Sequence, residues 1–208
     1  MIGRESGTQA VILIGFMGAG KSSVGRALSE HLGWVFEDLD RRIEQRERRK
    51  VYEIFRDSGE SGFRSAEHEA LKELLSDLRA EAGRIVALGG GAFVQKHNAR
   101  LVKAANVPTV FLDASVEELW RRCRKQSDDE GSERPLLTSL TSFRDLYDAR
   151  RPHYSKAFLR LETGGKTIDE IAAEVVATLG LQPSQQSRAG LGQRGSEQRR
   201  QRKRGEKL

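Results

Sequence analysis

The chain has 208 residues, of which 37% are hydrophobic and 32% charged, a composition that suits one globular domain with its own core. No apolar run approaches 18 residues, so we expect no membrane span, and the single cysteine excludes an intrachain disulfide and favours a cytosolic, reducing compartment. The net charge of +6 arises in residues 188–208, with eight basic and two acidic side chains, so the neutral remainder is not a basic nucleic-acid surface.

The first predicted element is a buried strand over residues 11–14, which are β-branched or aliphatic. The following sequence GFMGAGKS, residues 15–22, fits the phosphate-loop pattern G-x-x-x-x-G-K-[ST]. Residues 23–32 then space apolar side chains at helical intervals, and Gly33 ends the helix. Because strand, glycine-rich loop and helix follow in the required order, the sequence predicts a nucleotide phosphate site.

A second strand over residues 34–36 is predicted to run out into two carboxylates, Asp38 and Asp40. Side chains alternate along a strand, so we expect these carboxylates to face opposite sides, one towards Mg²⁺ and phosphates and the other towards an acceptor. Alternatively, the two carboxylates are only helix caps or surface charges. The nearby phosphate loop favours a role in binding or catalysis.

The rest of the chain continues the alternation of helices and strands. Helices are predicted over residues 41–56 and 63–82, with a turn at 57–62 between them. Later strands are predicted over residues 85–88, 107–112 and 158–161, the last as an edge strand, and later helices over 98–105, 115–125, 142–154 (interrupted by Pro152) and 168–179. The glycines at residues 89–91 indicate a tight turn or a close approach to a ligand.

This alternation predicts an α/β fold, a three-layer fold of the P-loop NTPase type with a five-stranded parallel sheet flanked by helices. Ligands bind such sheets at the carboxyl ends of the strands. We expect one domain over residues 1–182, with a mobile lid over about residues 126–137. Residues 183–208, rich in Ser, Gln, Gly and Arg, are expected to form a basic, disordered tail.

Together, these motifs resemble the shikimate kinase family. The family's order and spacing are matched by the phosphate loop, FEDLD at 36–40, GFR at 62–64, ALGGGA at 87–92, RPLL at 134–137 and RRPHY at 150–154. The resemblance covers about residues 10–180. It implies ATP-dependent phosphorylation of the 3-hydroxyl of shikimate, a step of aromatic amino acid biosynthesis, with Mg²⁺ as cofactor.

The resemblance also implies a role for each matching residue. The ATP-binding residues would be Gly18, Ala19, Gly20, Lys21, Ser22, Ser23, Arg122 (against adenine) and Arg134. Ser22 would bind Mg²⁺ and Asp38 would support it through water. The catalytic set would be Lys21, Asp40 (on the acceptor hydroxyl) and Arg134 (on the transferring phosphate). Shikimate would contact Asp40, Gly90 and Gly91, with Arg64 and Arg150 clamping its carboxylate.

Some features depart from the family pattern. The segment between Arg122 and Arg134 is longer than in compact members, residues 162–166 match the adenine-binding stretch weakly, and the basic tail lies outside the pattern. Two alternatives stay open: another P-loop small-molecule kinase, such as a gluconate kinase, or a non-catalytic relative acting as a binding protein. The expected partners are ATP and shikimate, with no membrane and no specific nucleic acid, and we expect a monomer.

Overall fold

The computed structural model describes residues 9–80, 83–130 and 139–184. Its five strands form one parallel sheet in the order β2-β3-β1-β4-β5. The strands are β1 Ala10–Ile14, β2 Val35–Asp38, β3 Arg84–Ala87, β4 Thr109–Asp113 and β5 Leu159–Glu162. The predicted five-stranded parallel sheet is thus confirmed, with β5 at an edge as expected.

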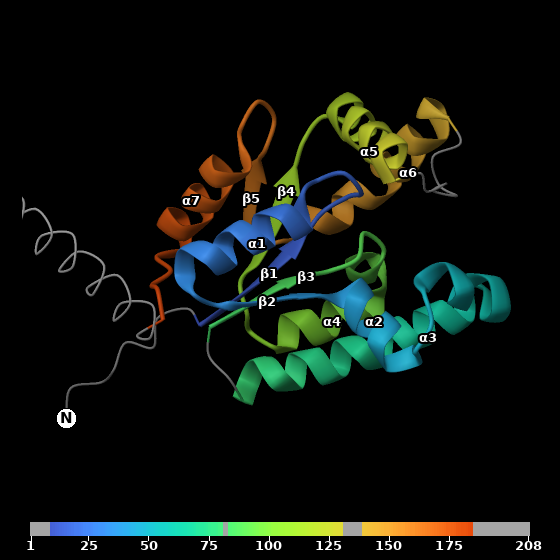
Figure 1. The fold of residues 1–208 in the computed structure, drawn as a ribbon, viewed down its shortest axis with the longest axis horizontal. Helices are drawn as coiled ribbons and strands as arrows, with labels where there is room; N and C mark the ends of the chain where they lie inside the picture. Colours follow the sequence, from blue (N-terminus) through green and yellow to red (C-terminus); the bar gives the residue numbers. More distant parts are fainter. Residues whose placement is uncertain (1–8, 81–82, 131–138, 185–208) are drawn as a thin grey trace, which may run out of the picture.

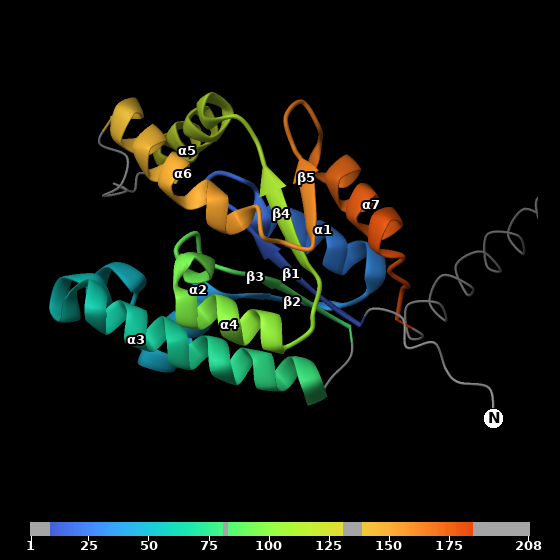
Figure 2. The same cartoon turned by 180° about the vertical axis from the view of Figure 1, so that it is seen from behind.

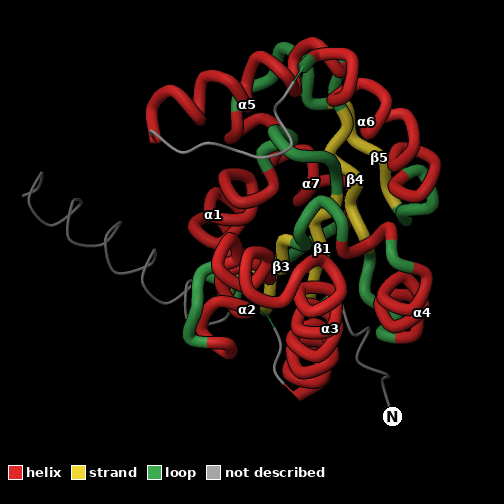
Figure 3. Tube along the Cα trace, turned by 90° about the vertical axis from the view of Figure 1, so that its right-hand side faces the viewer, coloured by secondary structure: helices red, strands yellow, loops and turns green. Residues whose placement is uncertain are grey.

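Helices cover both faces of this sheet. They are α1 Lys21–Leu32, α2 Leu39–Glu47, α3 Val51–Ala80, α4 Lys96–Ala104, α5 Val116–Glu130, α6 Leu140–Tyr154 and α7 Ile168–Leu179, with a short 3₁₀ helix, η1, at Ala92–Val94. Helices α1 and α7 pack together on one face, and α3 and α4 cover the other (Figures 1 and 2). Figure 3 shows α1 and α4 on opposite sides of the strands. The fold is therefore the predicted three-layer arrangement.

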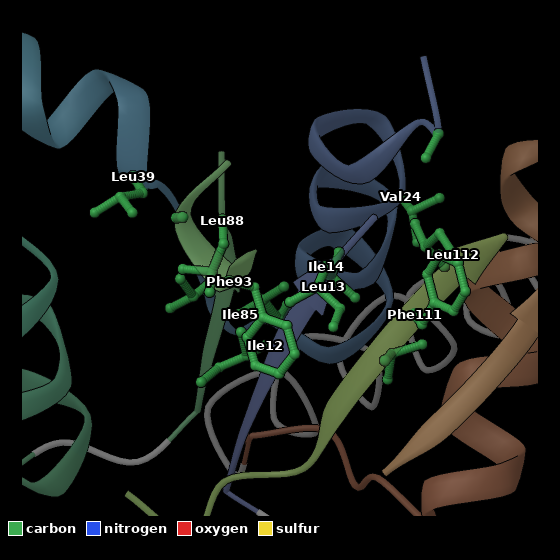
Figure 4. Packing of buried hydrophobic residues seen from close by; sticks show 14 of the residues in the cluster. Ile12, Leu13, Ile14, Val24, Leu39, Ile85, Leu88, Phe93, Phe111 and Leu112 are labelled. Atoms are coloured by element: carbon green, nitrogen blue, oxygen red, sulfur yellow. The ribbon is translucent and has the colours of Figure 1, made fainter. Parts of the chain in front are cut away.

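The central strand β1 carries the core. All five of its residues are buried, because helices exclude water from both faces of a parallel sheet. Figure 4 shows Ile12 and Leu13 of β1 among Ile85, Phe93 and Phe111 from neighbouring segments. This packing fixes the carboxyl end of β1, from which the phosphate loop leaves.

Two predicted boundaries in the first half of the chain differ in the structure. The predicted helix over residues 41–56 is divided between α2 and α3, and Arg48 ends α2 with a φ of 52°. The turn predicted at residues 57–62 shrinks to one non-helical residue inside α3, Gly59, with φ 65° and ψ −174°. A single glycine in this conformation redirects the chain, so a longer turn is unnecessary.

Two boundaries in the second half also differ. Helix α5 extends to Glu130, five residues beyond its predicted end, so the first residues of the predicted lid are helical. The remainder of the predicted lid, and the tail from residue 185, lie outside the described residues. Pro152 does not interrupt α6, which continues to Tyr154; in this last turn the missing proline N–H costs the helix one hydrogen bond to the preceding turn. Among the helices of the described ranges, none has the length and apolar character needed to cross a membrane.

Helix α1 packs against β2 through a glycine. A Cβ atom on Gly25 would lie 2.2 Å from Cε2 of Phe36. Alanine normally stabilises a helix interior over glycine by about 0.5–1 kcal/mol, whereas overpacking costs about 1–3 kcal/mol. We expect Gly25→Ala to lower the free energy of unfolding, measured by urea denaturation, and Phe36→Leu in the same chain to restore part of it. A more stable Gly25→Ala protein would contradict this packing.

Candidate active site

The phosphate loop closes tightly between β1 and α1. Gly15, Gly18 and Gly20 have positive φ angles of 148°, 77° and 85°. A Cβ atom on Gly18 would lie 2.7 Å from the carbonyl oxygen of Leu119 and 2.8 Å from Sγ of Cys123. Gly20 occupies the N-cap of α1 without a side-chain cap. The positive end of the helix dipole therefore faces the loop, where an anion is favoured.

The ammonium group of Lys21 contacts the backbone at the start of the phosphate loop. Its Nζ donates hydrogen bonds to the carbonyl oxygens of Gly15 and Phe16, each at 3.0 Å. The Phe16 ring holds this part of the loop in place by edge contacts with Phe143 and Tyr147, at centroid distances of 5.0 and 5.5 Å. The loop thus combines a fixed backbone with a cation at its centre.

The two aspartates that follow β2 do not lie on opposite sides, as alternation along a strand predicted. The strand ends at Asp38, and Asp40 is the second residue of α2. Asp38 caps that helix by accepting a hydrogen bond from the Asp40 backbone N–H at 3.1 Å, and both residues line one pocket. The prediction was wrong because the strand periodicity stops one residue after Asp38, where the helix begins.

Asp38 connects the second strand to the phosphate loop. Its Oδ2 accepts a hydrogen bond from the Ser22 hydroxyl at 2.6 Å. A hydroxyl and a carboxylate are hard oxygen ligands, the type that Mg²⁺ takes, and this ion commonly binds to only one or two protein groups beside phosphates and waters. In the described part of the chain, no group of three or more His, Cys, Asp or Glu residues could hold a metal. The Ser22 hydroxyl and the Asp38 carboxylate fit Mg²⁺ bound together with a nucleotide.

Asp40 is the carboxyl group of the pocket whose pKa is raised. Its side chain is reached by water from the pocket mouth, but protein atoms surround it, and one carboxylate oxygen packs against Gly89, where a Cβ atom would lie 2.7 Å away. Desolvation by these atoms, and then repulsion from Asp38, raises the pKa of Asp40 to about 6, against the attraction of Lys21. A carboxylate with such a pKa can accept a proton near neutral pH.

Two arginines flank the glycine turn after β3. A Cβ atom on Gly91 would lie 2.7 Å from Nη1 of Arg64, and one on Gly90 would lie 3.9 Å from Nη1 of Arg150. Glycine thus lets the Arg64 guanidinium approach the backbone. The turn is also tied to α6, because the Tyr154 hydroxyl donates a hydrogen bond to the Gly90 carbonyl oxygen.

Arg64 is held by acidic neighbours on its own helix. Its Nη1 lies 3.0 Å from Oε2 of Glu67, whose side chain is 1% exposed, and its Nη2 lies 3.2 Å from Oε1 of Glu60. Burial raises the pKa of Glu67, and the nearby Arg64 opposes this shift. These contacts orient the guanidinium, whose planar fork suits a carboxylate.

Arg122 lies on the opposite side of the pocket, on α5. Its Nη2 donates to the carbonyl oxygen of Thr163 at 3.1 Å, and its Nε donates to Oε1 of Glu118 at 2.8 Å. Thr163 is itself fixed by donating its hydroxyl to the carbonyl oxygen of Asp113 at 3.0 Å. The guanidinium is therefore positioned by two elements, although residues 162–166 matched the family pattern weakly.

One pocket of about 620 Å³ joins most of the predicted site. The predicted residues that line it are Gly18, Gly20, Lys21, Ser22, Ser23, Asp38, Asp40, Gly90 and Arg122. Ala19 is a buried residue of the loop itself. Arg64, Gly91 and Arg150 adjoin the pocket at the glycine turn, and Arg134 lies outside the described residues.

Sequence reasoning missed several residues of this pocket. Its lining also includes Arg26, Glu118, Arg121, Thr167 and Ile168. Tyr154, Glu67 and Thr163, which hold site groups in place, were not singled out either. Tyr154 stood in the RRPHY motif and Thr163 in the stretch 162–166, where their local sequence could have drawn attention to them.

A pocket of this kind can seat a nucleotide phosphate at the loop and a small anionic acceptor beside the arginines. That arrangement, at the carboxyl edge of a parallel sheet, is the one found in P-loop kinases of small molecules.

Comparison with known proteins identifies the family. The family model described as shikimate kinase matches residues 17–180, so the chain belongs to the shikimate kinase family. A shikimate kinase of Geobacter metallireducens is 39% identical over 181 residues, covering 86% of this chain and 96% of that protein. One of Persephonella marina is 36% identical over 170 residues, covering 81% and 98%.

Solved structures agree with this assignment. The shikimate kinase from Acinetobacter baumannii in complex with shikimate superposes with a TM-score of 0.70 at 31% identity, over 82% of this chain and 92% of that one. The expected P-loop kinase fold is thereby confirmed across the domain.

The raised pKa of Asp40 has a consequence for stability. The folded protein holds this proton more tightly than the unfolded chain, so the ionised carboxylate opposes folding increasingly as the pH rises from about 4 through about 6. We expect Asp40→Asn to raise the Tm of the protein at pH 8 and to change it little at pH 4, measured by calorimetry. Asp145→Asn, at an exposed position of α6, is the control. A lower Tm for Asp40→Asn at pH 8 would contradict the assignment.

Proposed function

We propose that this protein transfers the γ-phosphoryl group of ATP to the 3-hydroxyl of shikimate, giving shikimate 3-phosphate and ADP. The observation that carries the proposal is the single pocket in which the phosphate loop meets Asp40 and the glycine turn, with Arg64 and Arg150 beside that turn. Membership of the shikimate kinase family supports the choice of acceptor.

On the nucleotide side, residues 18–23 would hold the phosphates of ATP. The α1 N-terminus and the loop N–H groups favour the anion, and Lys21 would move from its contacts with Gly15 and Phe16 to the β- and γ-phosphates. Ser22 and Asp38 would hold Mg²⁺, which when bound neutralises charge on the phosphates. Arg122 would lie against the adenine. The role of Arg134 on the transferring phosphate stays a prediction.

On the acceptor side, Asp40 would orient the attacking hydroxyl and receive its proton. An O–P bond forms to the γ-phosphorus while the bond from that phosphorus to the β,γ-bridging oxygen breaks, and ADP leaves. Phosphoryl transfer depends mainly on positioning and charge neutralisation. Asp40 suits the tasks of orienting the hydroxyl and receiving its proton, because its carboxylate lies beside Gly89 in the pocket and its pKa of about 6 leaves it ionised yet basic at neutral pH.

Arg64 and Arg150 would clamp the shikimate carboxylate. The two guanidinium groups flank adjacent glycines, Gly91 and Gly90, so they approach the acceptor side from different helices. Paired arginines offer fixed forks of donors that match a planar carboxylate. Gly90 and Gly91 would also offer backbone contacts to the ring hydroxyls.

The direct test is ADP release from Mg·ATP by the purified protein, with and without shikimate, and with gluconate as the control acceptor. We expect shikimate alone to stimulate release, because the arginine clamp recognises a carboxylate on a ring that presents its hydroxyl to Asp40. Stimulation by gluconate instead would retain the P-loop chemistry and overturn the acceptor. No stimulation by either compound would overturn the proposed activity.

The clamp has its own test. Arg64→Ala removes a charge-assisted pair worth about 1.5–3 kcal/mol, so we expect the KM for shikimate to rise about tenfold to hundredfold and the KM for ATP to change little. Since this variant also leaves Glu67 buried without its partner, Arg150→Ala is made in parallel and should act in the same direction. Arg56→Ala, at an exposed position of α3, is the control. Equal rises in both KM values would show that Arg64 does not bind the acceptor.

A further inference from the structure

A second and larger pocket lies away from the phosphate loop. Its volume is about 990 Å³, and it is lined by η1, α4, the residues leading into β4, the end of α6, the start of β5 and the end of α7. Because the strands β4 and β5 contribute their first residues or those just before them, this pocket lies at the amino edge of the sheet. Figure 2 shows α4 and the end of α6 on the same side of β4. The proposed reaction leaves this pocket without a role.

The floor of this amino-edge pocket is apolar. Phe93 and Val102 are 7% and 1% exposed, and Val107 and Leu179 are partly buried beside them. Phe158 adds a wall that is 76% exposed. Its backbone N–H donates to the hydroxyl of Thr109 at 3.0 Å, which holds the start of β5 against β4. An aromatic ring so exposed at the edge of an apolar hollow offers a ligand a large hydrophobic contact.

The rim of the same pocket is basic. Its titratable side chains are Lys96, Arg100, Lys103, His153 and Lys156, and no Asp or Glu of the described residues lines it. No carboxylate of the described ranges forms an ion pair with any of these five groups, whereas cations elsewhere are commonly paired, as Arg42 is with Glu37 and Asp77. The rim therefore presents an unneutralised positive field over an apolar floor.

We propose that the amino-edge pocket binds a small organic anion, one that joins an apolar ring to a carboxylate or sulfonate group. The ring would pack on Phe93, Val102 and Phe158. The anion would meet the cations of α4 and Lys156, which follows α6. The volume falls within the range of about 300–1,000 Å³ usual for small-molecule sites. This inference does not depend on the proposed kinase activity.

Charge argues against two other occupants of this pocket, the basic segment 188–208 of this chain and a second copy of the protein. Residues 188–208 of this chain carry a net charge of +6, so the basic rim repels them. The same face of a second copy would bring the same five basic side chains opposite one another. A compact anion satisfies both the rim and the floor, and it needs no second protein surface.

The pocket is separate from the active site but close to it along the chain. Phe93 follows two residues after Gly91, and His153 precedes Tyr154, whose hydroxyl binds the Gly90 carbonyl oxygen. A binding test must therefore show that the probe does not occupy the phosphate-loop pocket. For this reason, the titration is made in the presence of saturating Mg·ADP and shikimate.

The probe is 8-anilinonaphthalene-1-sulfonate, an aromatic anion that fluoresces in apolar surroundings. We expect one molecule to bind per chain with Mg·ADP and shikimate present, 2-naphthoate to displace it, and the uncharged 2-naphthamide to displace it at least tenfold less well. Absence of probe binding when Mg·ADP and shikimate are present, or equal competition by the amide, would overturn the proposal.

Two kinds of variant locate the probe. Arg100→Glu with Lys103→Glu reverses the rim charge, and Ala99→Trp fills the hollow, so each should weaken binding at least tenfold without changing the rate of ADP formation. Arg56→Glu with Lys72→Glu, on α3, is the matched charge control and should bind as the unaltered protein does. If the variant with Arg100→Glu and Lys103→Glu fails to fold, Lys156→Glu reverses a rim charge on a different segment and should also weaken probe binding. Unchanged binding in the folded variants would place the probe elsewhere and overturn the proposal.

Discussion

The structure of the active site depends on the close approach of two backbone segments, in β4 and α5, to the glycines of the phosphate loop. A Cβ atom on Gly15 would lie 2.7 Å from the carbonyl oxygen of Leu112, and one on Gly18 would lie equally close to that of Leu119. The carboxyl end of β4 and the amino-terminal part of α5 therefore contact the loop directly. At Gly15 and Gly18 they leave no space for a side chain. Because α5 also carries Arg122, the packing that shapes the phosphate site places the proposed adenine contact as well.

Helix α6 extends this constraint to the acceptor side. Tyr147, Arg150 and Tyr154 recur at helical spacing, so they share one face. Tyr147 packs against Phe16 of the loop and donates to Oδ1 of buried Asp113 at 2.8 Å, the Arg150 guanidinium lies 5.8 Å from the Phe16 ring centroid, and Tyr154 binds the Gly90 carbonyl oxygen. One helical face thus connects the phosphate loop, the proposed carboxylate clamp and the glycine turn, an arrangement that would hold the nucleotide and the acceptor in a fixed relative position.

Local patterns predicted most of the fold, because strands and the phosphate loop depend on neighbouring residues. The exact boundary after β2 depended on a cap, so the alternation rule misplaced Asp40 relative to Asp38. Arg64 could not be selected from composition among so many arginines, and only the family resemblance singled it out. Its partner Glu67 lies three residues further along the same helix and outside every matched motif, and the Arg122 contact with Thr163 is a tertiary contact without a motif. The amino-edge pocket is assembled from separate segments, so no local pattern indicated it.

The clustered carboxylates of the candidate site lower the stability of the folded protein. Asp38, Asp40 and Glu67 gather in one region, where desolvation raises the pKa of both Asp40 and Glu67 and each ionised neighbour adds repulsion. Lys21 and Arg64 offset this charge only in part, since both pKa values remain raised. A hydrophobic substitution of Asp40 would relieve this desolvation and repulsion and would also remove the proposed proton acceptor. The buried sheet and the helices that cover it, with β1 buried along its whole length, must therefore supply the stability that the site gives up.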